Sequence, residues 1–485
     1  MLKSAFILAL LSVGIKVLGF GREVALSYQF GATLISDAYI LSIAIPGFFF
    51  VIISSAINSV YIPYANKFDD DNEKLKLTNK LINIFAVLIL LVIFLVNTFS
   101  AQLVELYIGG ANSELKKIAE GMLGLTTITL FVRILIVILN SYLQIKGRYL
   151  PTNLIGLPLN IFIIISILIA SEENYELLAV GFTVAMYSQL IVVIPFLLQC
   201  KYKYNFNLVR LEKFDFVIFS KLMSFVVIAA FVNQLNTVVD LRVASSLGVG
   251  YVSSINYALK LQILIQMIFV TSISIVFFPE IAKLYKIKKN TIGLLNQTIK
   301  TIVFFLTPIS IFTFWESNAI INFIFGHGAF DINAIEKTSL ALKYYSVGFL
   351  AFGVRELLLK DYYASNNMKK PLLFIGASTA INIALTLALA NYYGIAGIAM
   401  ATSISAYIFI MFIFFDIYKI KKSSILKVQY VEFTKCFVSA SISYGLVSVF
   451  TMHNFIFDGL IFLLFYLIVS FFLKVKLYKS IGSKF

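Results

Sequence analysis

Three positively charged residues stand in stretches of the chain that are otherwise apolar. Lys16 and Arg22 lie in LSVGIKVLGFGREVALSYQFG, and Lys260 lies in INYALKLQILIQ. Asn256 precedes Lys260 by one helical turn and shares its face. Lysine and arginine bind phosphate groups through charge-assisted hydrogen bonds. The pattern therefore favours a cationic site for an anion such as a phosphate or diphosphate.

The depth of these charges decides whether they can reach water. If the first helix enters the membrane near Ser4, Lys16 lies about 18 Å inside it. Lys260 lies about 14 Å from the outer end of its own segment. A charge at such depth costs roughly 2.5–3.5 kcal/mol, so both lysines should face protein or a water-filled cavity. Arg22 lies close to the outer interface, where its long side chain can reach water.

A structural role for Lys16 is the alternative. In that case Lys16 pairs with Glu23 or Asp37 and only locks helices together. Against this alternative, Lys16, Arg22 and Lys260 supply more positive charge than the two carboxylates neutralise. The excess charge favours a cationic cavity.

The composition identifies the elements that carry these residues. The chain has 485 residues, of which 60% are hydrophobic and only 13% charged, and its mean hydropathy is +0.93. Apolar stretches of about 20 residues recur, each long enough to cross a membrane as a helix. They predict an all-α integral membrane protein with about fourteen transmembrane helices. The predicted segments are 5–24, 34–62, 81–107, 118–145, 152–170, 176–198, 215–246, 251–281, 298–325, 338–363, 371–392, 394–417, 432–452 and 455–474.

The net charge of +15 is concentrated in alternate loops. Lysine and arginine gather after the even-numbered segments, whereas the other loops hold few basic residues beyond Lys116, Lys117 and Lys337. The positive-inside rule then predicts that both termini lie in the cytoplasm. Because these residues belong to solvated inner loops, the charge does not indicate nucleic-acid binding. No cluster of residues predicts a tightly bound metal.

An internal repeat predicts two related lobes. The matched residues are Pro63 and Pro279, 216 residues apart, and two pairs 222 residues apart, Arg133 with Arg355 and Asn160 with Asn382. A duplication of six helices gives parallel repeats and two pseudo-symmetric six-helix lobes. The predicted parts are 1–210 for the first lobe, 211–428 for the second, and 429–485 for a C-terminal helix pair.

Paired lobes of this kind are typical of alternating-access transporters, which bind their substrate between the lobes. The short loops argue against an enzyme. One face of segment 215–246 also carries Asn233, Asn236 and Asp240 at helical spacing. Such oxygen ligands suit a hard cation such as sodium, although hydrogen bonding between helices explains them equally well.

Several motifs resemble those of one family. They are GFGREVALSYQFGATLISDAYILSIAIPGFF, NSVYIPY, NTVVDLRVASSLGVGYVSSINYALKL, FGHGAFD and GIAGIAMATS. Together they resemble the MurJ/MviN family of the multidrug/oligosaccharidyl-lipid/polysaccharide exporter superfamily. The resemblance covers nearly the whole chain. It implies a flippase in the bacterial inner membrane that moves a polyprenyl-diphosphate-linked glycan by alternating access, with the peptidoglycan precursor lipid II as the first candidate.

The resemblance also implies roles for particular residues. Lys16 and Lys260 stand where the family tends to have arginines, and Arg22 and Asp37 match its basic and acidic residues around the lipid diphosphate. The same resemblance places a cation site at Asp240.

Possible partners of Asp240 in that cation site are Asn382 and Thr402. Coupling to sodium, to protons or to the membrane potential is therefore expected, and no other cofactor. The chain departs from the family at Phe50 and Val51, where a pair of arginines is usual, and at Ser55, where a glutamate is usual.

Two alternative functions follow from the same features. One is a flippase for an O-antigen or capsule-type lipid-linked oligosaccharide. The other is an ion-coupled drug antiporter of the superfamily, which would prefer an acidic cavity. The expected partners are the lipid-linked glycan, membrane lipids and proteins of cell-wall or polysaccharide synthesis, without nucleic acid.

Overall fold

The computed structural model describes residues 2–110, 112–206, 216–287, 289–365, 369–421, 425–449 and 455–475. All the regular secondary structure in these ranges is helical, which confirms the predicted all-α class. The predicted boundary between residues 210 and 211, the first residue of segment 215–246 and the last three of segment 432–452 lie outside the described residues.

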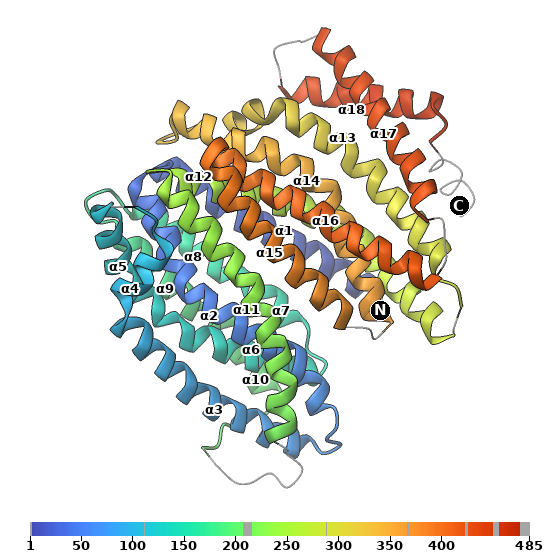
Figure 1. Cartoon of the computed structure of the whole chain (residues 1–485). Coiled ribbons are helices and arrows are strands. Elements are labelled where there is room, and N and C mark those ends of the chain that lie inside the picture. The colour runs from blue at the N-terminus through green and yellow to red at the C-terminus, as the bar shows by residue number, and fades with distance from the viewer. Residues whose placement is uncertain are drawn as a thin grey trace. The chain divides into compact units, whose positions relative to one another are not determined.

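The helices follow one another along the chain with short connections (Figure 1). In the first half they are α1 (Leu2–Phe30), α2 (Leu34–Ala65), α3 (Asp71–Thr98), α4 (Ser100–Tyr107), α5 (Ser113–Thr127), α6 (Thr129–Ile145), α7 (Leu150–Leu154), α8 (Gly156–Ile169), α9 (Leu177–Ser188), α10 (Leu190–Gln199) and α11 (Phe216–Ser246). In the second half they are α12 (Tyr251–Lys286), α13 (Ile292–Phe325), α14 (Ile332–Ala364), α15 (Lys369–Tyr393), α16 (Ile395–Lys421), α17 (Ile425–Val449) and α18 (Phe455–Phe472).

The predicted membrane segments all correspond to helices. Within the described residues, eleven helical stretches are long and apolar enough to cross a membrane. The other three predicted segments correspond to α1, α14 and α17. The chain is thus a multi-pass membrane protein.

Four predicted segments are each interrupted by a single turn residue: Phe99, Ile128, Ile155 and Gln189. At Ile155 the cause is Pro158, which has no N–H to donate to the carbonyl of Leu154. Near Ile128 the hydroxyls of Thr126 and Thr127 hydrogen-bond to the carbonyl of Leu123, and such bonds compete with the regular helical pattern.

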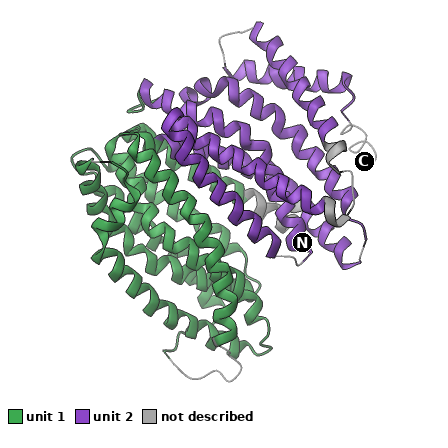
Figure 2. Ribbon diagram, in the orientation of Figure 1, with its two compact units in different colours: residues 1–253, 327–331 green, residues 254–326, 332–485 purple. Residues whose placement is uncertain are grey.

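The chain forms two compact units (Figure 2). Unit 1 comprises residues 1–253 and 327–331, and unit 2 comprises residues 254–326 and 332–485. Helix α11 belongs to unit 1, although the sequence repeat assigns it to the second lobe. It packs along α2 and α4, and Arg242 Nη1 donates hydrogen bonds of 2.9 and 2.8 Å to the carbonyls of Glu105 and Leu106. Packing and repeat membership are separate properties, so the predicted lobe boundaries stay a prediction.

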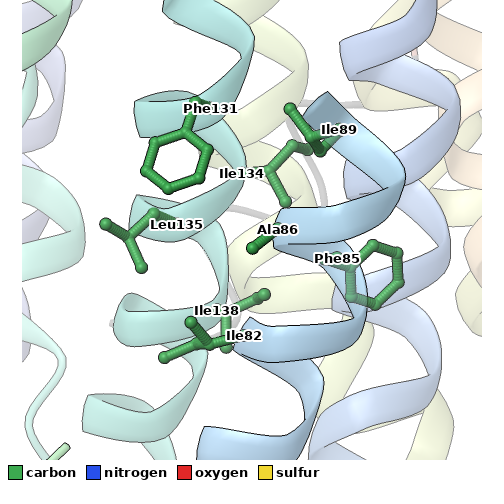
Figure 3. Close-up of a pocket in the computed structure, with 8 residues that line it drawn as sticks. All are labelled: Ile82, Phe85, Ala86, Ile89, Phe131, Ile134, Leu135 and Ile138. Carbon is green, nitrogen blue, oxygen red and sulfur yellow. The ribbon is translucent and has the colours of Figure 1, made fainter. Parts of the chain in front are cut away.

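In unit 1, α2 is a central helix that packs against α5, α6 and α11, while α8 packs against α1 and α9. Helix α6 also lies along α3 through a purely apolar seam (Figure 3). The seam encloses a cavity of about 10 Å³. Figure 3 shows its lining side chains, Ile82, Phe85, Ala86 and Ile89 of α3 and Phe131, Ile134, Leu135 and Ile138 of α6. A cavity this small and apolar has no polar partners to hold a water molecule, so the seam serves packing alone.

In unit 2, α13 packs on α14, α14 on α16, and α16 on α15. The C-terminal helices α17 and α18 pack on each other and on α13. Tyr466 of α18 is buried and donates a 2.8 Å hydrogen bond to the carbonyl of Phe304 in α13. This bond satisfies the only polar group of a side chain that is otherwise part of the core.

Candidate functional site

Helix α1 is held against α8 directly beside Lys16. A Cβ atom on Gly156 would lie 2.5 Å from Ile15 Cγ2, so only glycine permits this approach. Asn160 Nδ2 donates to the carbonyls of Gly156 at 2.8 Å and Ile15 at 3.4 Å. Because Ile15 faces α8, the next residue, Lys16, points about 100° away from that contact.

Lys16 is half-buried and forms no hydrogen bond or ion pair with any described residue. The carboxylates proposed as its structural partners are engaged elsewhere. Glu23 Oε1 lies 2.6 Å from Arg22 Nη2, and the Glu23 side chain is only 6% exposed. The structure therefore gives no support to a Lys16–Glu23 pair, and it shows that the charge of Arg22 is neutralised by its neighbour.

Asp37 is fully buried and binds the beginning of α12. Its Oδ2 accepts a hydrogen bond from the N–H of Gly250 at 2.6 Å, and its Oδ1 accepts from the N–H of Ser253 at 2.7 Å and from the Ser253 hydroxyl at 2.6 Å. Gly250 directly precedes α12, and Ser253 lies in its first turn, where no backbone acceptor is available. Asp37 thus caps α12 from a distant part of the chain, with its negative charge at the positive end of the helix dipole.

Gly250 makes this capping geometry possible. Its φ is +82°, and a Cβ atom there would lie 2.3 Å from the carbonyl oxygen of Ala32. A residue with a side chain would be strained by the φ angle and would also collide with the backbone. Asp37 therefore has a structural function in unit 1, and its predicted contact with the substrate stays a prediction.

Lys260 and Asn256 lie on α12 within unit 2, and both are half-buried. Lys260 forms no hydrogen bond or ion pair with the described part of the chain. Lys16 belongs to unit 1 and Lys260 to unit 2. The structure describes each lysine within its own unit, so their pairing around one anion stays a prediction.

Two residues of the predicted cation site, Asn236 and Asp240, contact each other on α11. Asn236 Nδ2 donates a 2.9 Å hydrogen bond to Asp240 Oδ2. Asn236 Oδ1 is enclosed and has no partner among the described residues, so a carboxylate and a free amide oxygen occur together, as a hard cation requires. Asn233 is exposed.

The other two predicted cation ligands belong to unit 2. Asn382 Oδ1 accepts a 3.2 Å hydrogen bond from Thr386 Oγ1, and Thr402 Oγ1 donates a 3.1 Å bond to the carbonyl of Ile398. Each side chain thus already bonds to its own helix.

Arg133 was not singled out by the sequence reasoning except as a marker of the repeat. Its guanidinium carbon lies 3.8 Å from the centroid of the Phe50 ring, and its Nη1 is enclosed without a hydrogen-bond partner among the described residues. The signal that could have found it is the one that found Lys16: a cation deep within an apolar helix.

The structure also contains an apolar cavity that the sequence did not reveal. It has a volume of about 500 Å³ and lies in unit 2 between α13, α14, α16 and α17. Its walls include Phe314, Trp315 and Tyr444. The Trp315 and Tyr444 rings stack at 5.7 Å, and the Tyr444 hydroxyl donates to Glu316 at 2.7 Å. Such aromatic and aliphatic walls suit a hydrocarbon chain.

Comparison with known proteins relates this geometry to one family. The model of the family described as "Lipid II flippase MurJ" matches residues 26–467. The probable lipid II flippase MurJ of Thermotoga maritima is 28% identical over 80% of this chain and 80% of its own length. The lipid II flippase MurJ of Thermosipho africanus is 28% identical over 85% of each chain.

Solved structures agree with the sequence relatives. A structure of the lipid II flippase MurJ in an inward closed conformation matches with a TM-score of 0.85 and 26% identity, and the match covers 96% of this chain and 98% of that one. An inward-facing multidrug resistance MATE transporter matches with a TM-score of 0.59 and 14% identity, covering 86% of this chain and 96% of that one. The second likeness concerns the fold alone. By the family model that matches most of its length, this chain belongs to the MurJ family of lipid II flippases.

Proposed function

We propose that this protein moves lipid II from the inner to the outer face of the bacterial inner membrane by alternating access. Family membership supports the substrate, and one structural observation supports the mechanism: Lys16 is a half-buried cation deep in a membrane-spanning helix without a carboxylate partner among the described residues. A cation held in this way is suited to an anionic ligand.

The diphosphate of the substrate is the group that Lys16 and Lys260 bind. An ammonium group contributes about 1.5–3 kcal/mol per charge-assisted hydrogen bond to phosphate. Lys16 belongs to unit 1 and Lys260 to unit 2. Each lysine can make such a contact from within its own unit.

The apolar part of the substrate needs a different environment. The cavity of about 500 Å³ in unit 2 can take a segment of polyprenyl chain, because most of its lining side chains are aromatic or aliphatic. The diphosphate and the hydrocarbon are thus bound by chemically distinct parts of the protein.

Both termini lie in the cytoplasm in this proposal, because the basic loops are costly to translocate. A single cysteine in place of Lys203 should react with a membrane-impermeant reagent only when the inner face is accessible. Labelling of this cysteine in intact cells would overturn the proposed orientation.

Transport is coupled to an ion gradient or to the membrane potential. Sodium bound at Asp240 is the first candidate, and protons or the membrane potential are the alternatives. The unpartnered Oδ1 of Asn236 supports a bound cation beside that carboxylate. The substitution Asp240→Asn should remove the response of transport to a sodium gradient in vesicles. A full response in this variant, or none in the wild type, would contradict sodium coupling.

The two alternative substrates have less support. The relatives described above are lipid II flippases, and the MATE drug transporter shares only the fold. Contacts with cell-wall synthesis proteins remain an expectation that follows from the substrate.

The proposal is tested by lipid II exposure on the far side of vesicles that contain the purified protein. We expect exposure with lipid II and none with protein-free vesicles. Transport of an O-antigen-type lipid-linked oligosaccharide without transport of lipid II would replace the proposed substrate by the first alternative. Transport of organic cations alone would replace it by the second.

A further inference from the structure

Arg133 is the starting point, because its charge has no protein partner within the described residues. It lies on α6, in the membrane-spanning stretch Ser113–Ile145. Nη1 is enclosed without a hydrogen bond, whereas the side chain as a whole is only half-buried. One part of the guanidinium group is thus covered and another part remains accessible.

The faces of α6 show where this group points. Phe131, Ile134, Leu135 and Ile138 face α3 across the apolar seam (Figure 3). At 100° per residue, Arg133 lies on the other side of the helix. There it meets α2, where the Phe50 ring covers one face of the guanidinium group with a centroid distance of 3.8 Å.

The contact with Phe50 does not account for the charge. A cation–π contact is weaker than the cost of enclosing an ionised group without hydrogen bonds. A buried cation that only stabilised the fold would have a carboxylate or carbonyl partner. Arg133 has neither among the described residues, so the accessible part of its guanidinium group is free to bind an anion.

The depth of Arg133 in the membrane relates it to Lys16, the cation proposed above to bind the diphosphate. Arg133 lies about 18 Å along α6 from its end at Ile145, which is the inner end in the orientation proposed above. In that orientation Arg133 and Lys16 lie at a similar depth, and neither has a hydrogen bond or an ion pair to the described residues.

We propose that Arg133 binds the diphosphate group of the transported lipid from within unit 1, together with Lys16. This inference rests on the proposed function and adds a contact residue to it. A diphosphate has two anionic groups and can bind two cations, and the planar guanidinium can donate two parallel hydrogen bonds to one phosphate. Phe50 holds the guanidinium plane in a fixed orientation for this contact.

The test separates ligand binding from stability. The purified full-length protein is titrated with farnesyl diphosphate, and its melting temperature is followed. We expect Arg133→Met to melt at the wild-type temperature or above, because an unpaired buried charge is replaced by an apolar side chain. The same variant should bind farnesyl diphosphate at least tenfold more weakly. Arg133→Lys keeps the charge but loses the planar fork. Its affinity for farnesyl diphosphate should lie between those of the wild type and Arg133→Met.

Arg355→Met is the matched control. Arg355 is the repeat-related arginine in unit 2, and it also lies over an aromatic ring, with its guanidinium carbon 4.7 Å from the centroid of Phe409. This control should change the affinity for farnesyl diphosphate less than twofold. Farnesol and chloride, titrated alone, show whether the hydrocarbon or any small anion produces the response.

The outcomes are distinct. Wild-type affinity in Arg133→Met, or an equal response to chloride, would overturn the inference. If Arg133→Met is not recovered from the membrane, the affinity of Arg133→Lys decides, and an unchanged value overturns the inference. Lipid II exposure in vesicles is a separate measurement. Wild-type protein that binds farnesyl diphosphate through Arg133 but does not expose lipid II would contradict the proposed function and leave the inference standing.

Discussion

Charged side chains are accommodated in opposite ways in two regions of the molecule. At the ends of α12, α14, α15 and α16 in unit 2, Lys370 Nζ lies 2.6 Å from Asp416 Oδ1, and the Tyr362 hydroxyl donates to Asp416 Oδ2 at 2.6 Å. The Tyr285 hydroxyl donates to Asp361 at 2.9 Å, and Asp361 is only 4% exposed. Each charge in this cluster has a partner.

In unit 1, by contrast, two charged side chains have no partner among the described residues. Lys16 and Arg133 lie deep in membrane-spanning helices, and the described residues provide neither with a hydrogen bond or an ion pair. Paired charges connect helices, whereas an unpaired charge at this depth costs free energy unless water or a ligand stabilises it. Substitution of a paired charge should therefore change stability, and substitution of an unpaired charge should change transport.

The largest expected effect is on transport, from the unpaired lysines. Lys16→Ala and Lys260→Ala should each reduce lipid II exposure at least tenfold at normal membrane abundance, because one charge-assisted contact of 1.5–3 kcal/mol is lost. Arginine at either position should retain more activity, since the sign of the charge is kept. The melting temperature should hardly change.

Lys76→Ala is the control for these variants, because Lys76 is exposed near the start of α3. This variant should expose lipid II at the wild-type level. Wild-type exposure of lipid II by the Lys16→Ala, Lys260→Ala double variant would show that the unpaired lysines do not bind the substrate, and the contrast between the two regions would lose its functional meaning.

Asp37 should show the opposite pattern, a loss of stability of roughly 2–4 kcal/mol in Asp37→Ala. The buried amides of Gly250 and Ser253 at the start of α12 would lose their acceptor, and each such loss costs about 1–3 kcal/mol. Asp37→Asn should cost less, because one oxygen still accepts. The measurement is the melting temperature of the purified protein. An unchanged value for Asp37→Ala would contradict the capping function.

The Lys370–Asp416 pair should give a smaller, coupled effect. Asp416→Leu leaves the Tyr362 hydroxyl and Lys370 without their acceptor, so we expect a loss of about 1–2 kcal/mol. Lys370→Met should cost about 1 kcal/mol or less, because its side chain is 39% exposed.

The double variant tests whether these two side chains interact. Asp416→Leu, Lys370→Met should cost less than the two single losses added together, as expected when both members of a pair are removed. Strict additivity in a double-mutant cycle would show that the 2.6 Å contact contributes nothing measurable.

The sequence predicted what depends on residue type and depth. The positions of the membrane helices and the unusual burial of Lys16 and Lys260 follow from hydropathy and from the cost of charge in hydrocarbon. The breaks within four segments were missed. The one at Ile155 could have been found from Pro158.

Contacts between distant parts of the chain were beyond the sequence. Asp37 hydrogen-bonds to an amide 213 residues away at the start of α12, and nothing in local spacing indicates such a partner. Arg133 was noticed as a repeat marker, and its lack of a partner became visible only when α2 and α6 were placed together. The large cavity is formed by four helices that are separate in sequence.

The smallest expected effect concerns a neutral contact in unit 1, which serves as the reference for the charged cluster of unit 2. The Tyr202 hydroxyl donates to Asn79 Oδ1 at 2.6 Å, and Asn79 Nδ2 donates to the carbonyl of Lys203 at 3.2 Å. Burial raises the pKa of the Tyr202 phenol above its usual value of 10.0. The contact therefore contributes fully below the unfolded pKa of about 10 and is lost as the pH rises through the folded value.

Tyr202→Phe should cost about 0.5–1.5 kcal/mol, and trypsin should cleave after Lys203 faster in this variant than in the wild type at pH 8. In the wild type the cleavage rate, corrected for the pH dependence of trypsin itself, should stay constant from about pH 7 to pH 9, because the phenol stays protonated throughout this interval. Tyr149→Phe is the control, since Tyr149 is 58% exposed. Trypsin should cleave this variant after Lys203 at the wild-type rate. A corrected cleavage rate that changes between pH 7 and pH 9 would mean that a titrating group stabilises residues 200–206. The distinction between a neutral contact in unit 1 and a charged contact in unit 2 would then be wrong.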